Sequence, residues 1–153
     1  MKIKIISIGN NPPKWAQDII LEYTSRFKDH FKIELIEIKS DKNIKSIKQK
    51  KIVEAQKILK FLDNDYIISL DEKGSCCSSK ALSKKLSNWM QNFPKLAFVI
   101  GGADGLDNTI LEYSSWVWSL SSLTLPHNLA KVILVEQLYR ASTILNNHPY
   151  HRE

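Results

Sequence analysis

Side chains able to move protons or bind phosphate concentrate near the carboxyl end of this chain. Three of its four histidines, His127, His148 and His151, lie within the last 27 residues. Arg140 and Arg152 lie there too, although the chain has only three arginines against 19 lysines. Imidazole transfers protons near neutral pH, and guanidinium binds phosphate through a planar pair of donors. This region therefore predicts proton transfer or phosphate contact.

Glu136 lies in an otherwise apolar stretch of the same region. It precedes Arg140 by four residues, one helical turn, so the two side chains are expected to pair on one face. A carboxylate in such surroundings is expected to be either paired or functional. His148 and His151 lack nearby cysteines and a clear third ligand, so no metal site is expected.

Two loops of unusual composition each follow an apolar run. In Gly101–Gly105, glycines would let backbone N–H groups approach a ligand closely, although a tight turn explains them equally well. The loop has neither the GxGxxG pattern nor the Lys and Ser/Thr of a P-loop. Leu120–His127 is irregular yet apolar, whereas most loops are polar. It suits backbone wrapped around a ligand or another chain, with core packing as the alternative.

Alternating apolar runs and amphipathic segments predict the elements that carry these loops. The expected strands are Lys2–Ile8, Ile33–Ile38, Tyr66–Leu70, Leu96–Ile100 and Trp116–Leu120. The expected helices begin at Pro12-Pro13, span Lys39–Lys60, follow a cap at Ser78 or Ser79, cover Asn108–Tyr113 and run from about Leu129 to Asn146. This alternation predicts one α/β domain over 1–153, with a mainly parallel sheet and helices on both faces. Ligands of such sheets bind beyond the carboxyl ends of the strands, where both unusual loops lie.

Positive charge is localised. The chain carries a formal +6, and Lys39–Lys60 alone holds eight lysines against Asp41 and Glu54, which is also +6. A basic face of this kind predicts a polyanionic partner, and a solvated helix surface is the alternative. We expect Lys45, Lys48 and Lys51 to contact that partner.

Composition also indicates the compartment. Cys76 and Cys77 are adjacent and cannot build a disulfide framework, which favours a reduced, cytoplasmic protein. No apolar run approaches the roughly 20 residues that a membrane-spanning helix needs. The opening run, Lys2–Ile8, is interrupted by Lys4 and too short for a signal peptide.

Motifs across the whole chain resemble the ribosomal RNA large subunit methyltransferase H family. They are Ile3–Gly9, Glu34–Ile38, Ser69–Asp71, Ile100–Leu106, Trp118–His127, Val135–Ala141 and His148–Glu153. The resemblance implies a SPOUT-class methyltransferase with a C-terminal trefoil knot, acting as a homodimer with S-adenosyl-L-methionine in the knot. It further implies methylation of N3 of a pseudouridine in helix 69 of 23S rRNA on the assembled ribosome.

The resemblance also assigns residues. Cofactor binding is implied at Leu70, Gly101, Leu120, Ser121, Ser122, Leu123, Thr124 and Leu125. The expected catalytic residues are His127, the first candidate for a general base, and then His151 and Tyr150, which the partner subunit would supply. Arg152 is also expected to be catalytic, and with Arg140 it would stabilise the anion or bind phosphate. Lys131 and Arg140 are expected to contact RNA.

The chain departs from the family pattern at a few places. It has Ala103-Asp104 where a Pro-Glu pair is common, and Lys131 where Arg is expected. Lysine attracts phosphate but lacks the bidentate fork of arginine. If the lysine helix only docks RNA, neutralising Lys45, Lys48, Lys50 and Lys51 should spare cofactor affinity.

Two other classes of function remain open from the residues alone. The lysine segment suits a non-catalytic RNA-binding module, although the chain has no aromatic RNP motif. The glycine loop suits a different nucleotide-binding α/β enzyme. Calorimetric titration with S-adenosylhomocysteine separates them, because the module would give no heat and the other enzyme would prefer a phosphate-bearing ligand.

Overall fold

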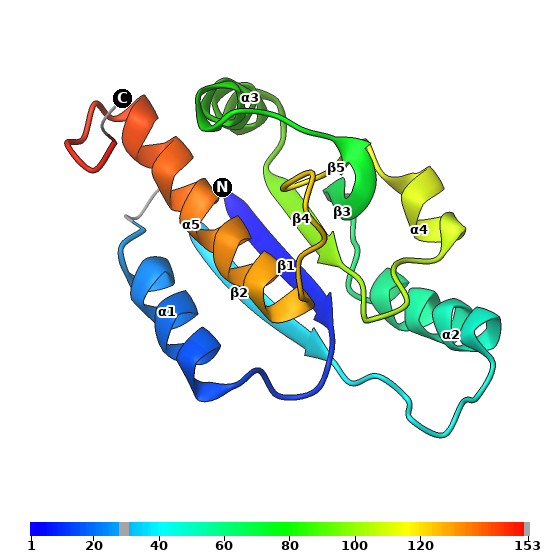
Figure 1. Ribbon diagram of the computed structural model, residues 1–153. Helices are drawn as coiled ribbons and strands as arrows, with labels where there is room; N and C mark the ends of the chain where they lie inside the picture. Colours follow the sequence, from blue (N-terminus) through cyan, green and yellow to red (C-terminus); the bar gives the residue numbers. More distant parts are fainter. Residues whose placement is uncertain (28–30, 152–153) are drawn as a thin grey trace.

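A five-stranded sheet forms the centre of the computed structural model, which describes residues 1–27 and 31–151 (Figure 1). The elements are β1 (Lys2–Ile8), α1 (Lys14–Ser25), β2 (Lys32–Ile38), α2 (Ile47–Leu59), β3 (Tyr66–Ser75), α3 (Ser79–Asn92), β4 (Lys95–Ile100), α4 (Asn108–Tyr113), β5 (Trp116–Trp118) and α5 (His127–Leu145). The strand order is β2-β1-β4-β3-β5, and every pairing is parallel. The predicted alternation of strand and helix is confirmed.

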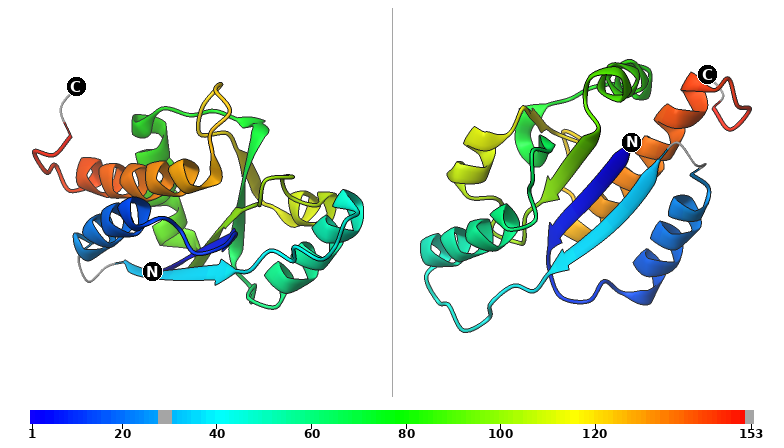
Figure 2. Two further views of the ribbon diagram at one scale, coloured as in Figure 1. Left: turned by 60° about the horizontal axis from the view of Figure 1, so that its bottom comes forward. Right: turned by 180° about the vertical axis from the view of Figure 1, so that it is seen from behind.

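Helices cover both faces of the sheet, as predicted. Helices α1, α3 and α5 pack on one face, and α2 and α4 on the other (Figure 2). Strand β1 contributes side chains to a hydrophobic core on each face, because its side chains alternate. Ile3 and Ile5 lie in the core beneath α1, α3 and α5, whereas Ile6 and Ile8 lie in the core beneath α2 and α4. Strand β1 is therefore buried on both faces, which explains its nearly continuous apolar sequence.

Lys4 interrupts that apolar sequence but is held by specific partners. Its Nζ donates to the carbonyl oxygen of Phe61 at 2.7 Å and to Oδ2 of Asp65 at 2.8 Å. The side chains of Lys4 and Asp65 are only 10% and 0% exposed. This ion pair ties the connection between α2 and β3 to the middle of the sheet.

Several predicted boundaries were wrong. Helix α2 begins at Ile47, not near Lys39, because Ser46 Oγ accepts from the backbone N–H of Gln49 and caps the helix. Helix α5 starts at His127, two residues earlier than expected. Pro13 is the N-cap of α1, so both prolines precede the helix. Of the two serines proposed as caps of α3, Ser78 is the one that accepts from the backbone of Ala81.

Strand β3 extends to Ser75 instead of ending at Leu70. The extension pairs with β5 across a register shift, where Ser75 lies opposite Trp118. Gly74 makes this approach possible, because a Cβ there would lie 2.7 Å from the carbonyl oxygen of Val117. Residues 71–75 thereby form a flap beside the last strand.

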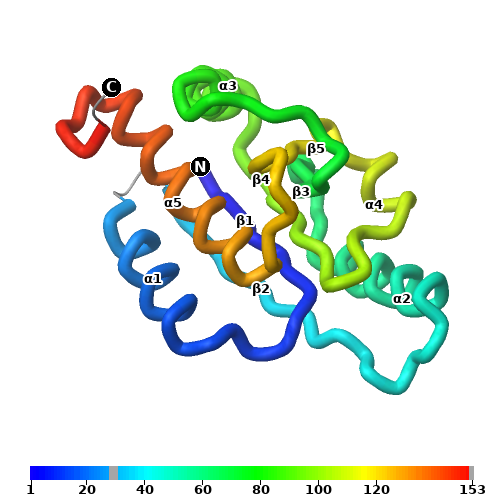
Figure 3. The backbone as a smooth tube through the Cα atoms, viewed as in Figure 1, coloured from blue at the N-terminus to red at the C-terminus, as the bar shows by residue number. Residues whose placement is uncertain are grey.

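The chain leaves β5 along this flap before it enters α5, as the tube drawing shows (Figure 3). The backbone N–H of Ser119 donates to the carbonyl of Ser75 at 3.1 Å, and Thr124 Oγ1 donates to Glu72 Oε2 at 3.2 Å. Segments 71–75 and 119–124 are therefore bonded to one another. The trefoil knot stays a prediction, and this close passage of two distant segments is consistent with it.

Candidate functional site

A cavity of about 860 Å³ opens where β3, β4 and β5 end. Its walls come mainly from residues 70–73, 100–106, 117–121 and 123–127, with Lys51, Asn108, Leu111 and Ala130 at the margins. This is the carboxyl edge of a parallel sheet, the position at which α/β proteins bind ligands. The predicted location of the ligand site coincides with this cavity.

Most residues expected to bind a cofactor line the cavity. Those that do so are Leu70, Gly101, Leu120, Ser121, Leu123, Thr124 and Leu125. Ser122 does not line it. Among the described residues of the loop, Leu123 is strongly exposed even though it is apolar, so one side of the cavity is left open. Leu120 packs against the core, so the alternative explanation for the composition of the loop, core packing, holds at its start but not at Leu123.

The glycine loop is a tight turn that follows β4 directly. The backbone N–H of Gly105 donates to the carbonyl of Gly102 at 3.1 Å, and Gly105 has a φ of +79°. Gly101 lies so close to the returning chain that a Cβ would be 2.8 Å from the carbonyl carbon of Gly105. The loop is both the turn that was the simpler explanation and a wall of the cavity.

His127 occupies the first position of α5 and borders the cavity. Its ring lies against Gly9 at the end of β1, where a Cβ would be 3.0 Å from His127 Nε2. The imidazole therefore lies at the sheet edge, between the end of β1 and the apolar loop. Of the expected catalytic residues that the structure describes, only His127 lines this cavity.

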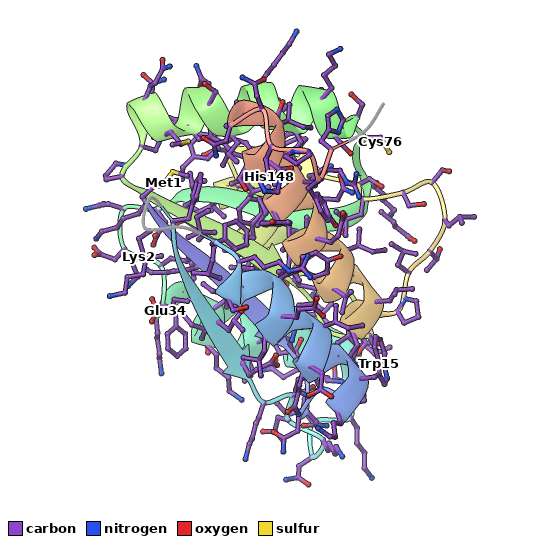
Figure 4. The ribbon with its side chains drawn as sticks, turned by 90° about the vertical axis from the view of Figure 1, so that its left-hand side faces the viewer. Met1, Lys2, Trp15, Glu34, Cys76 and His148 are labelled. Carbon is purple, nitrogen blue, oxygen red and sulfur yellow. The ribbon has the colours of Figure 1, made fainter. Side chains whose placement is uncertain are left out.

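The C-terminal tail lies at the other end of α5. Figure 4 shows His148 beyond the last turn of that helix. Helix α5 has 19 residues, which at about 1.5 Å of rise per residue separates its two ends by roughly 27 Å. Tyr150 and His151 therefore do not line the large cavity of their own chain. His151 borders a separate hollow of about 450 Å³. Arg152 lies outside the described residues.

Tyr150 is anchored rather than free. Its hydroxyl donates to Glu136 Oε1 at 3.0 Å and lies 3.1 Å from the hydroxyl of Tyr23. Burial and these two hydrogen bonds raise the pKa of Tyr150 well above its ordinary value. The phenol therefore stays protonated near neutral pH and is not available as a base in this arrangement, and it fastens the tail to α5.

The predicted pairing of Glu136 with Arg140 is confirmed. Arg140 donates from Nε at 2.9 Å and from Nη2 at 2.6 Å to Glu136 Oε1, and its guanidinium lies over the ring of Tyr150. The hydrogen bond to Glu136 raises the pKa of Arg140 further above its already high value. Its charge is thus largely neutralised within one chain.

The side chain of Lys131 is buried and paired within the protein. Its side chain is 3% exposed and donates to Glu37 on β2, so it joins α5 to the sheet. A buried, paired ammonium group has no free donor face for phosphate, which argues against the expected RNA contact. Lys45 and Lys48, by contrast, are exposed beside and on the first turn of α2.

Sequence reasoning placed Asp71 and Asp104 at the ligand edge but missed the rest of the polar wall of the cavity. Asp71, Glu72 and Lys73 on the flap line it, as do Asp104 of the glycine turn and Lys51 of α2. Lys51 had been assigned only to the basic surface. The flap was missed because the residues that continue β3 beyond Leu70 are polar, and polar residues after an apolar run are typical of a loop.

Within residues 1–27 and 31–151, no three His, Cys, Asp or Glu side chains are grouped so that they could hold a metal ion. Over the same residues, no helix has the length and apolar character needed to cross a membrane. Cys76 and Cys77 are both free thiols, and burial raises the pKa of Cys77.

Comparison with known proteins agrees with this fold. Solved structures of a probable methylase from Haemophilus influenzae (TM-score 0.59, 16% identity, 99% of this chain and 70% of that one) and a probable methyltransferase from Bordetella pertussis (TM-score 0.60, 14% identity, 91% and 95%) share it. A family model described as "Predicted SPOUT methyltransferase" matches residues 1–151. The sheet and its edge cavity therefore belong to a SPOUT methyltransferase.

Full-length relatives narrow the class. Proteins named ribosomal RNA large subunit methyltransferase H are 43% identical in Methylobacillus flagellatus (100% of both chains) and 44% identical in Legionella pneumophila (99% of both chains). The chain belongs to that family, and the resemblance stated from its motifs is confirmed.

Proposed function

We propose that this protein transfers a methyl group from S-adenosyl-L-methionine to N3 of a pseudouridine in helix 69 of 23S rRNA, on the assembled ribosome in the cytoplasm. The observation that carries the proposal is the edge cavity, whose walls are the glycine turn and the apolar loop on which the family resemblance rests. The relatives in this family are named as methyltransferases of large-subunit rRNA.

The cavity has the right chemistry for this cofactor. Its volume, about 860 Å³, falls in the range of about 300–1,000 Å³ typical of small-molecule sites. Leu70, Leu120 and Leu125 offer apolar surface to an adenine ring, and the backbone of the glycine turn offers polar groups. Acidic groups at Asp71, Glu72 and Asp104 suit a ligand that carries a net positive charge.

When bound, S-adenosyl-L-methionine supplies an electrophilic methyl group on its sulfonium sulfur. The tasks left to the protein are to align the acceptor nitrogen and to remove its proton. Orientation alone contributes several kcal/mol to such transfers. Because N3 of a uracil-type ring holds its proton firmly, a base at the cavity margin is needed. His127 is the described candidate that borders the cavity.

The separation of tail and cavity favours a homodimer. In one chain, roughly 27 Å of α5 lies between His127 and the tail. Tyr150 and His151 can act in catalysis only if a second subunit brings its tail to the cavity of the first. We therefore propose that Tyr150 and His151 of one subunit play their expected catalytic roles in the site of its partner.

The activity itself is tested with ribosomes from a strain that lacks this gene. Purified protein and labelled S-adenosyl-L-methionine should restore one methyl group per 23S rRNA, at N3 of a helix 69 pseudouridine, as mapped by nuclease digestion and mass spectrometry. Methylpseudouridine that persists in the deletion strain, or methyl groups at other positions, would contradict the proposal. If the protein bound no cofactor, the alternative function, a non-catalytic RNA-binding module, would be favoured instead.

Replacing His127 with Ala should slow single-turnover methylation by about 10²- to 10⁴-fold, the usual contribution of a general base. Affinity for S-adenosylhomocysteine should stay within a few-fold, because the side chain is at the margin of the cavity. Single-turnover rates between pH 6 and pH 9 provide the measurement. A rate and pH profile equal to those of the wild-type protein would remove His127 as the base.

A further inference from the structure

Helix α2 reaches the cofactor cavity with one side and solvent with the other. Lys50 and Glu54 are one turn apart and both lie beside the glycine turn, whereas Lys48 projects about 200° around the helix from Lys50. Lys48 is exposed, and Lys50 is partly buried. The lysines of this segment are therefore not one uniform surface.

The contact between Lys50 and the glycine turn is an ion pair. Its Nζ lies 3.3 Å from Asp104 Oδ2, and the two side chains are 24% and 27% exposed. Asp104 lines the cavity, but Lys50 does not. Any effect of Lys50 on a bound cofactor would therefore pass through Asp104 and the turn that carries it.

A second side chain of α2 lies beside the same turn. Glu54 is 4% exposed, accepts from Ser40 Oγ at 2.8 Å, and places Oε2 3.8 Å from where a Cβ on Gly102 would be. The turn is thus held between β4, which it follows, and α2, which lies behind it. Of these contacts, the ion pair with Lys50 is the one that fixes a side chain of the turn itself.

We propose that Lys50 is a positioning residue for the cofactor: by holding Asp104, it keeps the glycine turn in the conformation that binds S-adenosyl-L-methionine. This inference rests on the proposed function, because it presumes that the cavity holds that cofactor. It also divides the basic segment by role. Lys45 and Lys48 contact the polyanion, whereas Lys50 holds the glycine turn at the cavity. Neutralising Lys50 together with Lys45 and Lys48 is therefore expected to lower cofactor affinity.

Two single substitutions separate this role from a general charge effect. Lys50→Gln removes a positive charge near a cationic ligand, and Asp104→Asn removes a negative one. Through-space electrostatics alone would make S-adenosyl-L-methionine bind more tightly to the first variant and more weakly to the second. The ion pair predicts weaker binding in both, by about 2- to 5-fold, as expected for losing a partly exposed pair.

The full experiment measures dissociation constants by calorimetry, with S-adenosyl-L-methionine and with the uncharged-sulfur product S-adenosylhomocysteine. The double variant Lys50→Gln/Asp104→Asn should bind no worse than either single variant, since both remove one interaction. The reversed pair Lys50→Asp/Asp104→Lys should recover affinity for S-adenosylhomocysteine, which carries no net charge, to within about twofold of wild type. In the Lys50→Gln variant, methylation should show a raised KM for the cofactor with kcat unchanged.

Lys48→Gln is the matched control, because it removes the same charge from the exposed side of the same helix. It should leave cofactor affinity unchanged and weaken rRNA binding with a reduced salt dependence. Equal affinities for wild type, Lys50→Gln and Lys48→Gln would overturn the inference, as would opposite shifts in the two single variants. Wild-type protein that binds neither compound would instead refute the cofactor assignment on which the inference rests.

Discussion

Replacing Gly101 with Ala is expected to weaken binding of S-adenosylhomocysteine by at least about 10-fold and to reduce methylation in proportion. The added Cβ would lie 2.8 Å from the carbonyl carbon of Gly105 and 2.9 Å from the backbone nitrogen of Leu106. Backbone atoms cannot rotate away as a side-chain end can, so the turn must open. Overpacking of this kind typically costs about 1–3 kcal/mol. The free protein can relax outward, and so the strain falls mainly on the bound state.

The neighbouring glycine offers the matched comparison. A Cβ on Gly102 would meet the side-chain Cγ2 of Ile8 at 3.2 Å, a milder clash than the one at Gly101 and with a side chain instead of backbone. Gly102→Ala should therefore reduce cofactor affinity much less than Gly101→Ala. Calorimetry gives the affinities, and thermal unfolding of the free proteins shows whether the fold is retained. If the two variants bound equally well, close approach at Gly101 would not limit the site.

Replacing Lys4 with Met is expected to destabilise the protein by about 3–5 kcal/mol, the usual cost of removing one partner from a buried ion pair. The Asp65 carboxylate, which is 0% exposed, would lose its cation and stay buried with an unpaired charge. The carbonyl of Phe61 would lose its donor as well. The free energy of unfolding, measured by urea titration, gives the result.

Lys2 provides the control on the same strand. It also forms an ion pair, with Glu34, but the two side chains are 39% and 42% exposed. Lys2→Met should therefore change stability by no more than about 1 kcal/mol. Adding Asp65→Asn to Lys4→Met should recover part of the loss, because a neutral amide needs no cation. If Lys2→Met and Lys4→Met lowered the free energy of unfolding by similar amounts, burial of the Lys4–Asp65 pair would not contribute to stability.

Features that depend on local spacing could be predicted from the sequence. The alternation of strands and helices follows from hydrophobic periodicity, and the ligand edge follows from where parallel strands end. The Glu136–Arg140 pair was predictable because four residues make one helical turn. Gly101 and the apolar loop were found because their composition is unusual for their position.

Features that join distant segments could not be predicted in this way. Lys131 looked like an RNA contact until the fold brought it to Glu37 on an edge strand. Tyr150 looked like a free tail residue, yet its partners include Tyr23, 127 positions earlier. Lys50 meets Asp104 across 54 positions. Long-range ion pairs and hydrogen bonds carry no periodic signal, so a single sequence does not reveal them.

The strand order has a consequence for how this chain folds during synthesis. Strand β1 lies between β2 and β4, and its first residue pairs with Lys95. Until β4 leaves the ribosome, β1 can pair with β2 only. More than half of the chain is therefore made before the other edge of β1 is paired. Sheets that join such distant segments fold slowly, because long loops must close first. The cavity needs β5 and the first turn of α5 as well, so it can form only after these segments have been made.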